Sequence, residues 1–154
     1  MAADSEFTPV VPRLGCLRGV STLTSFGLAL EVGDWDRLTG ASIGAYLGLV
    51  PTESSSGQSR SQGSITKTGN THARRLPVEA AWHNLKPYRN PRATMRARWE
   101  QAPAAARAGR HAGNQGLHQR WVHFAARKEK PVVANVAIAR ELAGWCWSLA
   151  VMDD

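Results

Sequence analysis

The segment 131–150 constrains the fold more than any other part of the chain, because its pattern is that of a buried helix. Pro131 favours the first position of a helix, and only Arg140 and Glu141 carry charge in the interior of the segment. The same two charges interrupt the apolar run well short of the ~18 residues that a membrane-spanning helix needs. Apolar residues recur at helical spacing at Val133, Val136, Leu142, Cys146 and Leu149. In a chain of 154 residues, this helix predicts the centre of one compact domain.

Five further segments carry helical signals, and no stretch alternates with period two for long enough to argue for a sheet. The segments are 9–17, 23–33, 39–48, 70–86 and 103–127. In the second, Leu23, Phe26 and Leu30 are spaced for one helical face. In the fourth, Pro77 predicts a kink or a false start near Leu76. The Ser- and Gly-rich stretch 52–69 is expected to be a loop and the Pro/Arg-rich stretch after residue 87 a connector, so the fold class is mainly α.

Charge is concentrated in the middle of the chain. The whole chain has a formal net charge of +7, but residues 58–130 hold fifteen basic and three acidic residues, a net +12, and the remainder is net −5. Such a stretch favours a polyanionic partner, nucleic acid first, although an ordinary solvated face is an equal alternative. Trp82, Trp99 and Trp121 lie in this stretch and could stack on bases, but tryptophans at helical spacing are more often core anchors.

Cysteine and histidine usage argues against a metal site in this chain. Cys16 and Cys146 lie far apart without further ligands at metal-binding spacing, and both are expected to be small core residues. The five histidines never show the i, i+4 spacing that places two on one helix face. No secretory signal is visible at the N-terminus, so the sequence predicts a cytoplasmic protein that does not enter a membrane.

The turn Gly19-Val20-Ser21 between two helical segments is a candidate helix-hairpin-helix element. In such an element a glycine-containing turn lets backbone N–H groups at the start of the second helix face a DNA phosphate. Ser21 stands where the motif most often has a second glycine. The alternative is an ordinary corner between two helices, which the pattern alone favours.

The Ser-rich stretch is the second candidate site. A serine can attack a phosphodiester if a base takes its proton and cationic groups stabilise the charge on the phosphoryl oxygens. Arg60, Lys67, Arg74 and Arg75 are candidate cationic donors. Composition alone nevertheless favours a flexible linker over a catalytic loop.

Six short motifs follow one another along the chain. They are LRGV at 17–20, EVGD at 31–34, YLGL at 46–49, SSG at 55–57, GSITKTGN at 63–70 and VEAAW at 78–82. Together they resemble the C-terminal domain of the DEDD-type bacterial insertion-sequence transposases, and a further match returns at 139–144. The resemblance extends from about Leu14 to Ala150. Pro77, where the family usually has leucine, and Gly116, in a stretch usually rich in arginine, depart from the family pattern.

The resemblance implies DNA transposition and recombination by serine attack on a DNA strand, with a transient phosphoserine link. The family serine stands directly before a glycine, which maps onto Ser56, with Ser55 as the alternative because the run 54–56 leaves the register open. Lys67, Arg74 and Arg75 would hold the scissile phosphate or its neighbours. The residues expected to contact DNA are Gly19, Val20, Ser21, Gly57, Arg60, Lys67, Gly69, Arg74 and Arg75.

The resemblance also implies partners. Family members act with an acidic RuvC-like half that binds Mg²⁺, at least some are guided by an RNA, and a homo-oligomeric transposition complex is expected. Only Asp4 and Glu6 are acidic before Gly19, so the RuvC-like half is expected to be absent from this chain.

We therefore expect residues 1–154 to be a truncated C-terminal domain, inactive in recombination alone. Its expected parts are a helix-hairpin-helix region (9–50), a serine-bearing loop (51–69) and a basic helical region (70–150). The alternative is a non-catalytic helical nucleic-acid-binding module.

Overall fold

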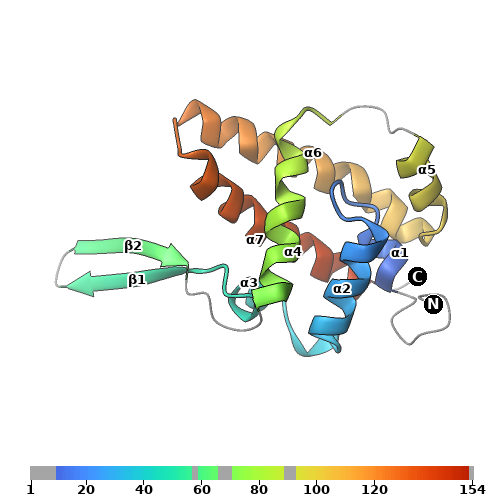
Figure 1. Cartoon of the computed structure of the whole chain (residues 1–154), viewed down its shortest axis with the longest axis horizontal. Helices are drawn as coiled ribbons and strands as arrows, with labels where there is room; N and C mark the ends of the chain where they lie inside the picture. The colour runs from blue at the N-terminus through green and yellow to red at the C-terminus, as the bar shows by residue number, and fades with distance from the viewer. Residues whose placement is uncertain (1–9, 57–58, 66–70, 89–92, 153–154) are drawn as a thin grey trace.

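The computed structural model describes residues 10–56, 59–65, 71–88 and 93–152 (Figure 1). The described helices and strands are α1 (Val10–Leu14), α2 (Thr22–Val32), the 3₁₀ turn η2 (Trp35–Arg37), α3 (Ser42–Tyr46), β1 (Pro51–Ser56), β2 (Ser59–Ile65), α4 (Thr71–Ala81), the 3₁₀ turn η3 (Trp82–Leu85), α5 (Ala93–Glu100), α6 (Ala104–Ala126) and α7 (Pro131–Ala150). The predicted mainly α class is confirmed.

Helix α7 is the centre of the domain, as its sequence predicts. It packs against α1, α3, α4 and α6, and α4 crosses it in Figure 1. Ile138, Leu142 and Cys146 are buried. Val133, at the start of the helix, is exposed instead, whereas the next two residues, Ala134 and Asn135, are buried, so Val133 lies on the outer side of the first turn. None of the described helices combines the length and the apolar character needed to cross a membrane.

Two predictions for the helices were wrong in detail. Helix α2 forms where expected and ends at Gly33, but Leu23 and Leu30 are 81% and 51% exposed. The buried face of α2 consists of Ser25, Leu28, Ala29 and Val32. Spacing therefore identified the helix but not the side that faces α1 and α4. The expected connector after residue 87 contains helix α5, in which Trp99 is the buried residue that anchors it.

The stretch expected to be a loop forms a β-hairpin instead. Strands β1 and β2 pair antiparallel, with Ser56 opposite Ser59, Ser55 opposite Arg60 and Pro51 opposite Ile65. The hairpin extends away from the helices in Figure 1. Because a paired ribbon satisfies backbone hydrogen bonds whatever its side chains are, a serine-rich stretch without an apolar face can form one. The sequence signal was Gly57-Gln58, a two-residue connection of a type common in hairpins.

Helix α4 runs unbroken through Pro77, where a kink or false start was expected. Pro77 is buried, and the helix continues to Ala81 before it tightens into η3. Asn70, the first residue of the segment predicted to be this helix, lies outside the described residues. At the other end of the chain, helix α1 stops at Leu14, earlier than predicted, and single turns closed by Cys16 and Leu17 continue the chain.

Both cysteines are buried, as predicted. Burial raises the pKa of the Cys146 thiol from 9.0 to about 12. Since the unfolded thiol ionises first, the stability that this group contributes is complete below pH 9 and is lost as the pH rises towards 12. We expect the free energy of unfolding to fall by about 1.4 kcal/mol for each pH unit above 9 from this group. Urea unfolding of wild type and Cys146→Ala at pH 8, 9 and 10 measures it: the variant should show a shallower pH dependence, and equal slopes would contradict the assignment.

Candidate nucleic-acid interface

The predicted nucleophiles lie at the far end of the β-hairpin. Ser55 and Ser56 are the last two residues of β1, and the register pairs position 55 with Arg60 and position 56 with Ser59. Neighbouring positions of a strand belong to opposite faces, so positions 55 and 60 share one face of the ribbon and positions 56 and 59 the other. The structure thus places Arg60 directly across from Ser55. Gly57, Lys67 and Gly69 lie outside the described residues.

Arg74 and Arg75 lie in the first two turns of α4, the helix that follows the hairpin in the chain. The Arg75 guanidinium is exposed and forms an i, i+4 ion pair with Glu79 at 3.2 Å. The Arg74 guanidinium donates to the Thr71 hydroxyl at 3.4 Å. An exposed ion pair of this kind contributes little stability, so both arginines can exchange these contacts for a phosphate at low cost.

The turn between α1 and α2 packs closely against the end of helix α4. Gly19 has a φ of +81°, and a Cβ there would lie 2.4 Å from the Ala80 carbonyl oxygen. Val20 is fully buried, and its N–H donates to the Leu17 carbonyl at 3.3 Å. Ser21 is exposed, but its Oγ accepts from the Thr24 N–H at 3.1 Å and caps α2. The close approach at Gly19 and the burial of Val20 give these two residues a structural role. Their contacts with DNA stay a prediction.

Buried polar contacts hold the same turn to α6. The Asn114 side chain accepts from the Arg18 N–H at 2.9 Å and donates to the Cys16 carbonyl at 3.1 Å. The Arg18 guanidinium donates to the Pro87 carbonyl at 3.1 Å and lies over the Tyr88 ring. Burial lowers the pKa of Arg18, while the charge interaction with Tyr88 opposes that shift. These contacts fix the turn before any ligand binds.

The structure separates the turn from Arg74 and Arg75. Helices α2 and α4 run antiparallel, since Gly19 contacts Ala80 and His83 while Gly27 contacts Leu76. The turn therefore lies at the end of α4, and Arg74 lies about 9 Å earlier along the helix axis, from six residues at 1.5 Å each. Arg74 and Arg75 lie instead at the end of α4 that follows the hairpin.

Two of the three tryptophans considered as possible base-stacking groups are core residues, and the third is partly exposed. Trp99 and Trp121 are buried, and their indole N–H groups donate to the Cys16 and Ala81 carbonyls, so both are core anchors. Trp82 is 40% exposed and stacks on Trp121 with ring centroids 5.5 Å apart. Its outer face is the part of this group that remains accessible to a base.

Within the part of the chain that the structure describes, no group of three or more His, Cys, Asp or Glu residues could hold a metal ion. The described residues therefore do not fit a Mg²⁺ site of the kind that the RuvC-like half would provide. We assign no metal-dependent step to them.

Comparison with known proteins identifies the family of this chain. The profile of the IS116/IS110/IS902 transposase family matches residues 12–99, more than half of the chain. A Sinorhizobium fredii protein named transposase y4qE is 37% identical over 95% of this chain and 39% of its own length. A Pseudomonas aeruginosa protein named family 20 transposase is 32% identical over 90% of this chain and 35% of its own length.

The chain thus spans less than two fifths of the length of these curated relatives. No solved structure matches it. The matched segment runs from α1 to α5 and includes the turn, the hairpin and the two arginines of α4. The chain belongs to the IS116/IS110/IS902 family of transposases.

Proposed function

We propose that this chain is the serine-bearing part of its transposase, and that it binds DNA and cuts and rejoins strands at the end of the β-hairpin. The observation that carries the proposal is the placement of Ser55 and Ser56 at the end of a paired ribbon, with Arg60 across from Ser55. A two-stranded ribbon has the width to enter the major groove of DNA. Six residues of β1 at about 3.3 Å each give the ribbon a reach of roughly 20 Å.

In the proposed reaction, Ser56 Oγ attacks a backbone phosphorus while a base takes its proton. An Oγ–P bond forms, the bond from phosphorus to one deoxyribose oxygen breaks, and that oxygen leaves with a proton. The hydroxyl of a second strand then attacks the phosphoserine and releases Ser56. Arg60, which the register pairs with Ser55, is the cation that would stabilise the phosphoryl oxygens. Arg74 and Arg75 lie in α4, away from the end of the hairpin, and would hold neighbouring phosphates of the strand.

Other expectations attach to the same proposal. A RuvC-like part of the enzyme supplies the Mg²⁺-binding carboxylates, and we expect the present chain to bind DNA without it but not to recombine DNA. A guide RNA, self-association in the transposition complex, the helix-hairpin-helix role of the turn and the cytoplasmic location stay predictions.

Trapping a covalent protein–DNA adduct tests the proposal. The chain is mixed with a RuvC-like polypeptide of the family, Mg²⁺ and labelled DNA that spans the ends of its insertion sequence, and the products are separated under denaturing conditions. We expect a labelled adduct whose phosphorylated peptide contains Ser56. DNA binding without an adduct, with every component present, would instead favour a non-catalytic nucleic-acid-binding module.

A further inference from the structure

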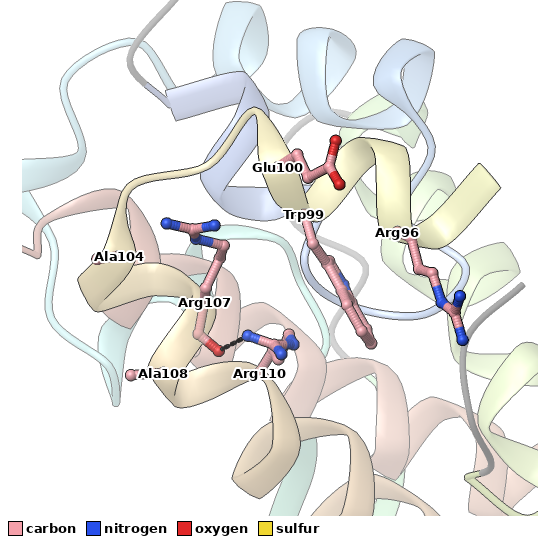
Figure 2. A pocket seen from close by; sticks show the side chains of 7 residues that line it. All are labelled: Arg96, Trp99, Glu100, Ala104, Arg107, Ala108 and Arg110. Atoms are coloured by element: carbon pink, nitrogen blue, oxygen red, sulfur yellow. Dashed lines mark hydrogen bonds between the residues drawn. The ribbon is translucent and has the colours of Figure 1, made fainter. Parts of the chain in front are cut away.

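A cleft of about 440 Å³ lies between α5 and the first turns of α6 (Figure 2). Arg96, Trp99 and Glu100 of α5 line one side, and Ala104, Arg107, Ala108 and Arg110 of α6 line the other. In Figure 1 this end of the molecule lies opposite the hairpin. The cleft is therefore a separate feature from the serine site.

Three of the cleft residues are arginines and one is acidic. Arg107 and Arg110 are three residues apart on α6, so they share one side of that helix. Ion pairs between described residues join Arg75 to Glu79, Arg120 to Glu141 and Arg127 to Glu129, and none of them includes a cleft arginine. The three arginines outnumber Glu100, so the cleft lining has a formal charge of +2 (three positive and one negative). An anion in the cleft would relieve the repulsion between the arginines.

The Arg110 guanidinium is already held in place. Its Cζ lies 4.3 Å from the centre of the Trp99 ring, and one terminal nitrogen donates to the Arg107 carbonyl. Trp99 is itself fixed, because it is buried and its N–H donates to the Cys16 carbonyl at 3.2 Å. Arg110 Nε is buried without a hydrogen-bond partner. Because this guanidinium is already fixed on an aromatic face, its terminal donors can bind an oxyanion at a small cost in side-chain entropy.

The start of α6 adds to the positive character of the cleft. Pro103 precedes the helix without a side-chain cap, and the first turn contains no acidic residue. The positive end of the dipole of this 23-residue helix therefore remains uncompensated by its own side chains. Ala104 and Ala108, which line the cleft beside this helix start, are small and exposed.

We infer that this cleft binds a phosphodiester of a nucleic-acid strand, through Arg107 and Arg110 with Arg96 at its edge. The inference rests on the proposed function for the identity of the ligand as nucleic acid. Since the cleft and the hairpin lie at opposite ends of the molecule, the phosphate in the cleft is not the one that is cut. The contact positions the strand and carries no base specificity.

The test compares two double variants of the full chain in fluorescence anisotropy with labelled DNA between 50 and 200 mM salt. Arg107→Gln/Arg110→Gln removes two cleft charges, and Arg127→Gln/Lys130→Gln removes two exposed charges near the opposite end of α6. We expect the cleft variant to bind at least about tenfold more weakly, with the slope of log K against log salt reduced by about 1 per lost phosphate. The matched control should retain the wild-type slope more closely.

A single variant distinguishes the loss of a phosphate contact from a failure to fold. Arg96→Gln, which changes an exposed residue, should also lower the slope even if the double variant fails to fold, as judged by circular dichroism. An unchanged slope in Arg96→Gln and the folded cleft variant, or an equal loss in both double variants, would overturn the inference. Wild type that binds no nucleic acid would contradict the proposed function itself.

Discussion

Replacing Ser56 with alanine should lower DNA strand exchange by about a thousandfold or more, while DNA binding remains within about twofold of wild type. Loss of a nucleophile removes the covalent step, and known serine nucleophiles lose roughly 10³-fold or more in rate on such a change. A single serine hydroxyl contributes little to DNA affinity compared with the charged contacts to phosphates. Strand exchange with a RuvC-like polypeptide present, together with anisotropy on the same DNA, measures both effects.

The neighbouring Ser55 supplies the matched control. Ser55→Ala makes the same chemical change one position along β1, on the opposite face of the ribbon. We expect a reduction of less than about tenfold, because the chemistry depends on which face meets the phosphate. If Ser55→Ala abolishes exchange and Ser56→Ala does not, the nucleophile is Ser55, the residue paired with Arg60, and the assignment of Ser56 is wrong.

Gly19→Ala should be the most destabilising single-methyl addition in the protein. The new Cβ would lie 2.4 Å from the Ala80 carbonyl oxygen and 2.9 Å from the His83 ring, and the backbone at φ +81° disfavours any side chain. Strain at positive φ and overpacking each cost roughly 1–3 kcal/mol, so we expect a loss of about 3 kcal/mol. In a chain of this size that lowers Tm by roughly 10 °C, which thermal unfolding followed by circular dichroism measures.

Alanine substitutions at two other glycines separate backbone strain from steric overlap as causes of the lost stability. Gly33→Ala has a similar φ of +72° but open space around the new methyl group, so it isolates the backbone strain at about 1 kcal/mol. Gly116→Ala lies in α6 with nothing within 4 Å and should stabilise the protein by up to about 1 kcal/mol. A Gly19→Ala loss no larger than that of Gly33→Ala would show that the turn can move away from α4.

The sequence predicted the long helices well because their signals are local. Pro131 and Gly33 mark helix ends through backbone chemistry that does not depend on the rest of the fold. The buried face of α2 could not be predicted the same way. Leu23 and Leu30 have the required spacing, but Leu28 and Val32 have it too, and only the positions of α1 and α4 decide which pair faces inward.

The candidate site was predictable in its residues and not in its shape. The serines and the cations could be named from motif and composition, but a hairpin without an apolar face gives no alternation, and its main signal was the pair Gly57-Gln58. The cleft arginines were missed because Arg96 and Arg110 are fourteen residues apart, and a helix that was not expected, α5, brings them together.

The central position of α7 sets a limit on how this family can be divided. The family profile ends at residue 99, yet α1, α3 and α4 within it all pack against α7, which begins at Pro131. A polypeptide cut at residue 99 would leave Leu14, Ile43 and Ala80 facing water. The family profile thus ends before the folding unit does, while the similarity to the curated relatives extends over 90–95% of the chain, well beyond residue 99. Genetic exchange within the family must therefore keep the C-terminal helix together with the hairpin.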